Sequence, residues 1–257
     1  MKKIITVLLS VMTLFAFASC AQSQQQDPQL AYETAAQKTA GLKDRDLTIA
    51  MDIAGTADGQ DIQATVDATA KCAYQGENPE MAINLKYQMQ GITMEIPMYY
   101  KDGYMYTEMF GQKIKGEAEA DSLQMDGSMQ TFTKEFFKEI KEGEVTQDGV
   151  KYAFVGDPEK VGELTDSLLG AMNESMAGSG MEAKITKIDG SFTVNKEGYL
   201  SSQELNMEMA SEIDGAAANY TAKVVFTVNN PGQPVTIEFP DFSDYQEANM
   251  DGNSLIS

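Results

Sequence analysis

Residues 46–53 read Asp46-Leu47-Thr48-Ile49-Ala50-Met51-Asp52-Ile53, and they decide the fold because large apolar side chains recur at every second position. A period of two is that of a β-strand, whose successive side chains point to opposite faces of a sheet. Strands with one apolar face are typical of antiparallel sheets that pack one side on a core. The sequence therefore predicts half-buried antiparallel strands here and wherever the alternation returns, at 62–74, 81–89, 92–96 and 218–228.

Turn signals separate further strands. Lys101-Asp102-Gly103 stands between 98–100 and 104–106 and predicts a tight hairpin. Gln147-Asp148-Gly149 predicts a second hairpin that leads into a strand from Val150. In the last third of the chain, alternation predicts strands at 185–194, 205–209, 218–228 and 235–239.

Three segments have a helical period instead. Pro28–Leu42 carries a proline in its first turn, which favours a helix start. Thr131–Glu142 places Phe132, Phe136, Phe137 and Ile140 on one side of a helix. The third segment starts at Asp157-Pro158-Glu159, where a capping acid precedes a proline, and runs to about Met176. Its apolar stripe consists of Val161, Leu164, Leu168, Leu169, Met172 and Met176. Helices and strands in this order predict an α+β fold.

The first 20 residues resemble a bacterial lipoprotein signal. Lys2 and Lys3 precede an apolar run at 4–17, which is too short for a membrane-spanning helix, and small residues then lead to Cys20. Phe17 departs from the leucine usual three positions before the cysteine. We expect Cys20 to carry fatty acyl groups such as palmitate and to anchor the protein to a bacterial membrane, outside the cytoplasm. The alternative is an ordinary secretory signal with a chance cysteine.

These signals divide the chain into four parts. Residues 1–19 are the expected signal peptide, and 20–28 are the lipidated cysteine with a polar, flexible tether. Residues 29–240 have the size of one domain that can bury a core. Residues 241–257 are acidic and polar, and we expect a loosely ordered tail.

The chain is strongly acidic. Its formal net charge is −20, and without Lys2 and Lys3 of the leader 17 basic residues face 39 acidic ones. Phosphate groups of nucleic acids require Lys and Arg, so nucleic acid is excluded as a partner. The same shortage of Lys and Arg argues against electrostatic binding to anionic lipid headgroups. Membrane attachment is therefore expected to come from the anchor at Cys20.

Residues that carry common chemistry are missing. The chain has no histidine, which excludes Ser-His-Asp and Cys-His catalysis and most zinc sites. With Cys20 acylated, Cys72 is left alone, and its phase with Val66 and Ala70 predicts a buried structural thiol rather than a reactive one. We expect no enzyme activity, no cofactor and no metal site.

Several stretches resemble a known superfamily. They are Ala31-Tyr32-Glu33 through Leu42-Lys43, the run Tyr99-Tyr100-Lys101-Asp102-Gly103-Tyr104-Met105-Tyr106, Gln112-Lys113-Ile114-Lys115, and Val235-Thr236-Ile237-Glu238-Phe239-Pro240. With the order of elements, they resemble the LolA/LolB and LppX-like bacterial lipoproteins over residues 28–242, and most closely an uncharacterised lipoprotein domain family of Gram-positive bacteria. The resemblance implies a curved antiparallel sheet, a half-open barrel, with helices packed in its concave face.

The same resemblance implies an apolar cavity between sheet and helices, which accepts an acyl chain in the carrier members. Flexible methionines suit variable apolar ligands, although each could equally fill the core. The candidate cavity residues are Met51, Met81, Met89, Met94, Phe132, Phe136, Leu164, Leu168, Met172, Met207 and Met209. We therefore expect a non-catalytic binder of an acyl chain, lipid or lipoprotein. The alternative is an envelope protein–protein interaction module with a dry core.

Overall fold

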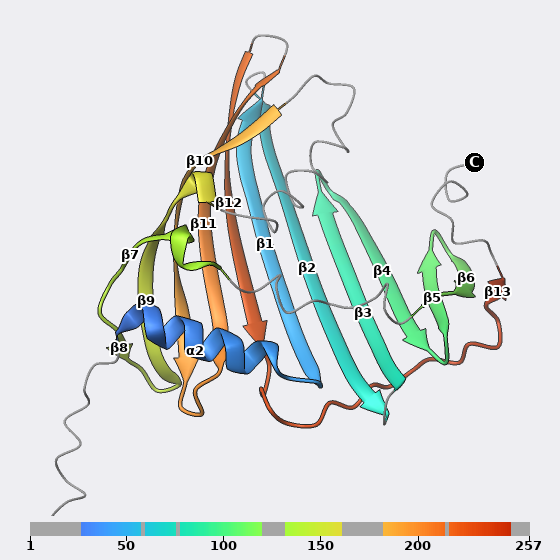
Figure 1. Cartoon of the computed structure of the whole chain (residues 1–257). Coiled ribbons are helices and arrows are strands. Elements are labelled where there is room, and N and C mark those ends of the chain that lie inside the picture. Colours follow the sequence, from blue (N-terminus) through green and yellow to red (C-terminus); the bar gives the residue numbers. More distant parts are fainter. Residues whose placement is uncertain are drawn as a thin grey trace, which may run out of the picture.

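One large curved antiparallel sheet dominates the molecule and is not closed into a barrel (Figure 1). The computed structural model describes residues 27–57, 60–75, 78–119, 132–160, 182–213 and 216–247. Along the sheet the strand order is β13-β6-β5-β4-β3-β2-β1-β12-β11-β10-β9-β7, and β8 also pairs with β9. The predicted antiparallel architecture is confirmed in this respect.

The N-terminal half of the sheet is a meander in which each strand pairs with the next. The residues predicted to alternate all lie in these strands, and the two-residue turns Gln90-Gly91, Asp102-Gly103 and Phe110-Gly111 have positive φ at both positions. The strands are β1 (Arg45–Ala57), β2 (Gln60–Gln75), β3 (Asn78–Met89), β4 (Ile92–Lys101), β5 (Tyr104–Met109) and β6 (Gln112–Glu117).

The C-terminal half is a second run of antiparallel strands, and its last strand pairs with β1. The expected strands at 185–194, 205–209 and 218–228 are confirmed, as is the strand from Val150. The strands are β7 (Phe137–Ile140), β8 (Glu144–Val145), β9 (Gly149–Gly156), β10 (Glu182–Asn195), β11 (Leu200–Ile213) and β12 (Ala216–Val228).

Helix α2 (Pro28–Ala40) covers part of one face of the sheet, which we call the inner face. Asp27 caps it, since its Oδ1 accepts hydrogen bonds from the backbone N–H groups of Gln29 and Leu30. The helix contacts β10 and β11 and buries Ala31, Tyr32, Ala35 and Ala36 against them. The helix predicted from Pro28 is therefore confirmed.

The helix predicted at Thr131–Glu142 is wrong. Its described part forms a single turn, η3 (Lys134–Phe136), followed by strand β7. The aromatic spacing did predict burial, because Phe132 and Phe136 stack with ring centroids 4.1 Å apart in the core. Pairing with the free edge of β9 satisfies the backbone of 137–140, and this competes with a helix.

The helix predicted from Asp157 lies mostly outside the described residues. Its first residues form the short turn η4 (Pro158–Lys160), and residues 161–176 are not described. Among the described residues α2 is the sole α-helix, and it is too short and too polar to cross a membrane. The expectation of several helices packed in the concave face is thus not confirmed.

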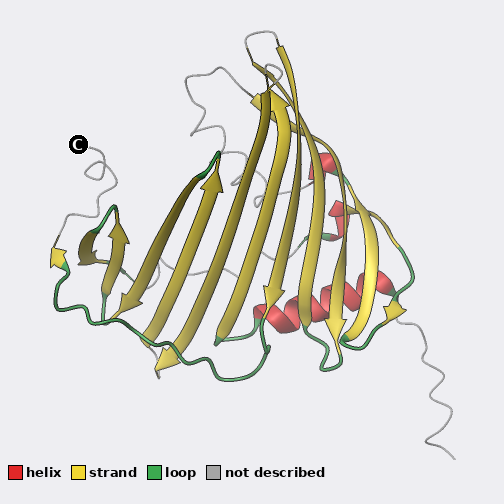
Figure 2. Cartoon of the chain, turned by 180° about the vertical axis from the view of Figure 1, so that it is seen from behind, coloured by secondary structure: helices red, strands yellow, loops and turns green. Residues whose placement is uncertain are grey.

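Residues 234–247 form a strap across the opposite, outer face of the sheet (Figure 2). The strand predicted at 235–239 makes no ladder, although its alternate side chains are half-buried. Phe242 stacks on Tyr106 of β5 with centroids 3.8 Å apart, and Tyr245 is buried. The strap ends in β13 (Gln246–Glu247), which pairs in parallel with β6. Residues 241–247, assigned from sequence to a loose tail, are therefore held by aromatic packing.

Tyr32 fastens α2 to the rest of the core. Its hydroxyl accepts a hydrogen bond of 2.7 Å from the backbone N–H of Phe132, and its ring lies 4.8 Å from Phe137 and 4.9 Å from Phe192. Burial raises the pKa of the Tyr32 phenol well above its usual range, although the hydrogen bonds with Phe132 and Gln203 oppose this. One side chain therefore connects the helix to Phe132, β7 and β10.

Replacing Tyr32 by phenylalanine should lower the free energy of unfolding by about 1–3 kcal/mol at neutral pH, because the buried Phe132 N–H loses its partner. In the wild type the unfolded phenol ionises above about pH 10 while the folded one stays neutral, so stability falls as the pH rises past that value. Urea titrations at pH 7 and above pH 10 should show that the free energy of unfolding falls less between these two pH values for Tyr32→Phe than for the wild type. Tyr74→Phe, at a position 40% exposed, is the control and should change little.

Gly190 of β10 allows close packing against β11 and β9. A Cβ at this position would lie 1.9 Å from the backbone oxygen of Glu204 and 2.9 Å from the ring of Phe154. Gly190→Ala should therefore lower the free energy of unfolding by about 2–3 kcal/mol. Gly41→Ala is the matched control, since its nearest neighbour would lie at 3.5 Å. Equal unfolding midpoints for the two variants would contradict this packing.

Candidate functional site

The inner face continues beyond α2 as an apolar surface on β2, β3 and β4, which we call the open half. Its side chains are half-buried and alternate with polar ones that point to the outer face. Strand register sets them in rows across the sheet, such as Ala68, Leu85 and Ile96. The open half consists of Val66, Ala68, Ile83, Leu85, Tyr87, Met89, Met94, Ile96 and Met98.

The open half is continuous with the buried core. One row runs from Val224 of β12, which is fully buried, through Met51 of β1 to Val66 of β2, and then to Tyr87 and Met94. All five side chains share the inner face because directly paired residues of neighbouring strands point to the same side. Val224 is buried and the other four side chains are half-buried, so the row stays apolar while it leaves the core.

The described helices cover the other half of the sheet. α2 contacts β10 and β11, and η4 contacts β10, so the described helical elements lie over the C-terminal strands (Figure 1). The core beneath α2 is filled by rings: Tyr152 stacks on Phe192 at 4.9 Å, and Phe137 meets Phe154 edge to face at 5.2 Å. An apolar surface without a described helical cover therefore lies beside a densely packed core.

The structure divides the candidate cavity residues into three groups. Phe132, Phe136, Met207 and Met209 are buried in the core beneath α2, where Met51 packs against them. Met81, Met89 and Met94 share the inner face of β3 and β4, but the buried Met81 lies at one end of β3, while Met89 and Met94 lie near the other. Leu164, Leu168 and Met172 lie outside the described residues, as does Cys20. One shared cavity for the whole set stays a prediction.

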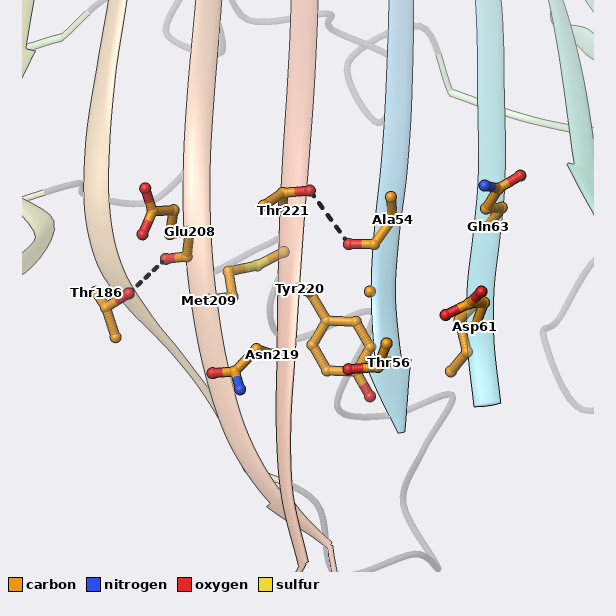
Figure 3. Close-up of a pocket in the computed structure, with 12 residues that line it drawn as sticks. Ala54, Thr56, Asp61, Gln63, Thr186, Glu208, Met209, Asn219, Tyr220 and Thr221 are labelled. Atoms are coloured by element: carbon orange, nitrogen blue, oxygen red, sulfur yellow. Dashed lines mark hydrogen bonds between the residues drawn. The ribbon is translucent and has the colours of Figure 1, made fainter. Parts of the chain in front are cut away.

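Three hollows in the described part of the molecule have walls of mixed character, with both polar and apolar side chains. One of about 630 Å³ spans β10, β11, β12, β1 and β2, and a neighbouring one of about 250 Å³ crosses β10, β11, β12 and β1. In Figure 3 the hydroxyl of Thr186 donates to the backbone oxygen of Glu208, and that of Thr221 donates to the oxygen of Ala54. Backbone groups thus hold these hydroxyls in place. A hollow of about 510 Å³ beside Met89 is likewise lined by glutamines, a threonine and an aspartate.

The titratable groups of the described residues do not form a catalytic set. Cys72 is a free, half-buried thiol, and burial raises its pKa, against the opposing charge of Arg45. This agrees with a structural thiol, which is protonated and weakly nucleophilic at neutral pH. Hydrogen bonds with Glu208 and Asp189 raise the pKa of the outer-face Lys187. Among the described residues no group of three or more Asp, Glu or Cys is arranged to hold a metal ion.

Sequence reasoning found the residues of the open half as alternating apolar positions and named two of its methionines, Met89 and Met94, as candidates. It missed the contribution of Val66, Ile83, Leu85, Ile96 and Met98 to one surface. The signal that could have found them is the register, since the tight turn Gln90-Gly91 fixes which residues of β3 and β4 lie opposite each other. The alternation of apolar and polar residues in a strand does not predict which element covers its apolar side chains.

Comparisons with known proteins give a family and distant structural neighbours. The LprF structure from Mycobacterium bovis is 15% identical, with a TM-score of 0.43, covering 83% of this chain and 96% of that one. A DUF1329 family protein from Desulfovibrio piger is 9% identical, with a TM-score of 0.26, covering 81% and 95%. No curated protein matches the sequence. A family model matches residues 29–242, so the chain belongs to DUF6612, a family of unknown function.

Proposed function

We propose that this protein is a non-catalytic binder of an apolar ligand, such as an acyl chain or a lipid, which lies on the open half of the inner face. The observation that carries the proposal is the continuous apolar surface of β2, β3 and β4 beside a filled core. Soluble proteins rarely present large contiguous apolar surfaces unless a ligand or partner covers them.

The surface suits a flexible chain rather than a rigid polar molecule. Met89, Met94 and Met98 contribute unbranched, polarizable side chains that adapt to ligands of different shape. Each methylene transferred from water onto the surface contributes about 0.8 kcal/mol, so an acyl chain can offset the entropy lost on association. The hydroxyl of Tyr87 lies 2.8 Å from the sulfur of Met89 and is a polar group within this surface.

A lipid anchor at Cys20 would hold this binding surface outside the cytoplasmic membrane. The sequence pattern of the leader supports the anchor, and the resemblance to LolA/LolB and LppX-like lipoproteins supports an apolar cargo. The net charge of −20 supports an anchor that is covalent rather than electrostatic. The absence of histidine from the chain supports a role without acid–base catalysis.

Leu85 provides the test of the binding surface. Protein from residue 21 onward, purified from a bacterial host, should release a lipid mass on denaturation in native mass spectrometry and should take up a fluorescent fatty acid. Leu85→Glu should weaken that uptake at least about tenfold, because a carboxylate would be desolvated beneath the ligand. Gln88→Glu adds the same charge on the outer-facing side of β3 and is the matched control.

Circular dichroism should show the same strand content in both variants. Equal uptake by Leu85→Glu and the wild type would reject the open half as the binding surface. A clean unliganded mass, with no fatty acid uptake, would reject the ligand and favour an envelope protein as the partner.

Cys20 provides the test of the anchor. In a bacterial host that processes lipoproteins, the wild type should sediment with membranes and incorporate labelled palmitate. Cys20→Ser should do neither and should appear in the soluble extracytoplasmic fraction. A Cys20→Ser variant that stays in the membrane fraction would contradict the proposed anchor.

A further inference from the structure

The tip of the β5–β6 hairpin presents an aromatic ring to solvent. Phe110 is 86% exposed, the highest value among the large hydrophobic side chains of the described residues. It occupies the first position of the two-residue turn Phe110-Gly111, between Met109 and Gln112, which pair with each other. Its φ is +51°, a conformation that bulky residues rarely adopt.

Two sister turns show what this position normally holds. Gln90-Gly91 and Asp102-Gly103 have φ values of 50° and 82°, and of 53° and 82°, close to the 51° and 77° of Phe110-Gly111. The first residue is polar in both sister turns, as expected for a position with positive φ. Phe110 therefore combines an unfavourable backbone conformation with almost no burial. Its ring contributes little to folding, which points to a contact outside the chain.

A second exposed apolar side chain lies at the same end of the sheet. Because neighbouring strands are antiparallel, the turns after β3 and β5 lie at one end and the turn after β4 lies at the other (Figure 1). Ile92, which follows the turn after β3, is 68% exposed. Asp102 occupies the opposite end. Phe110 and Ile92 therefore lie toward the same end of the meander.

The basic side chains that follow Phe110 in the sequence have acidic partners within the chain. Residues 108–115 contain two lysines and one glutamate, whereas the chain has a net charge of −20. Lys113 lies directly opposite Glu108 in the hairpin, and the ammonium of Lys115 lies 3.6 Å from the carboxylate of Glu247 in the strap. Neither lysine is therefore assigned to a phosphate group, and the exposed ring is the feature that points to a partner. A single protruding ring lacks the broad flanking area that a stable protein interface requires. A bilayer requires only shallow insertion of an aromatic side chain at the headgroup level.

We propose that the β5–β6 hairpin is a membrane-contact tip, which inserts Phe110 into the headgroup–acyl boundary of a phospholipid bilayer. This contact is separate from the open half, so it does not depend on the binding of an apolar ligand there. It also does not depend on acylation of Cys20, although an anchor would keep the tip near a membrane.

The absence of tryptophan from the chain allows a direct test. Phe110→Trp gives a protein with a single indole reporter, which can be held on phosphatidylcholine vesicles by an N-terminal histidine tag in place of Cys20 and a nickel-chelating lipid. On the vesicles the emission of this indole should shift to shorter wavelength and be quenched by lipids brominated on their acyl chains. Asp102→Trp places the indole in the same turn position at the opposite end of the sheet, and its emission should stay as in water.

A second variant separates membrane contact from a structural role. Phe110→Asn places in the turn a residue that tolerates positive φ, so the midpoint of urea unfolding should stay the same or rise. A clearly lower midpoint would show that the ring serves the fold and would overturn the proposal. An indole at position 110 that stays in water on the vesicles would also overturn it and would leave the tip to a protein partner. Neither result would affect fatty acid uptake by the open half.

Discussion

The pairing of β1 with β12 is the constraint on which the rest of the structure depends. It runs from Leu47 opposite Val228 to Thr56 opposite Asn219 and joins two strand runs that lie far apart in the sequence. Asn229 reinforces one end, since its side chain donates to Asp46 and Thr48 at 2.8 and 3.0 Å. Bringing β1 and β12 together closes a long loop of chain, which costs conformational entropy. Burial of apolar surface offsets this cost only when the apolar rows of both strand runs form one face. Without this pairing, the core beneath α2 and the open half would not share a surface.

The sequence predicted the strands better than the segments between them, for a physical reason. Alternation reports one-sided burial, and in β1 to β4 this coincides with ladder pairing. At 235–239 the same alternation occurs in a strap that lies on the outer face without a ladder, so burial was inferred correctly and hydrogen bonding was not. At 132–140 the aromatic spacing fits a helix, but the free edge of β9 offers strand pairing. Long-range partners decide both cases, and a local pattern does not contain them.

The candidate site was predictable in composition and not in arrangement. Met89 and Met207 have the same local signature, an apolar residue in an alternating strand, yet Met207 is buried beneath α2 and Met89 lies on the open half. The difference arises from where α2 settles, which depends on Tyr32 and on contacts with β10 and β11. Phe110 is the opposite case. A Phe-Gly pair is not typical of a tight turn, and only the positive φ and the exposure of Phe110 in the structure show that this aromatic residue lies at a hairpin tip.

Among the described residues, the buried side chains that stabilise the core and the exposed apolar side chains lie in different halves of the sheet. The largest fully buried side chains are Tyr32, Phe136, Phe192, Ile188 and Val224, and they belong to α2, η3, β10 and β12. The proposed contacts with ligand and membrane belong to β2 through β6. Functional surfaces that expose apolar groups cost stability, so they are tolerated where another part of the molecule supplies the packing. The strap supports the meander from the outer face, through Phe242 and Tyr245, so this described segment does not occupy the inner face of β2, β3 and β4.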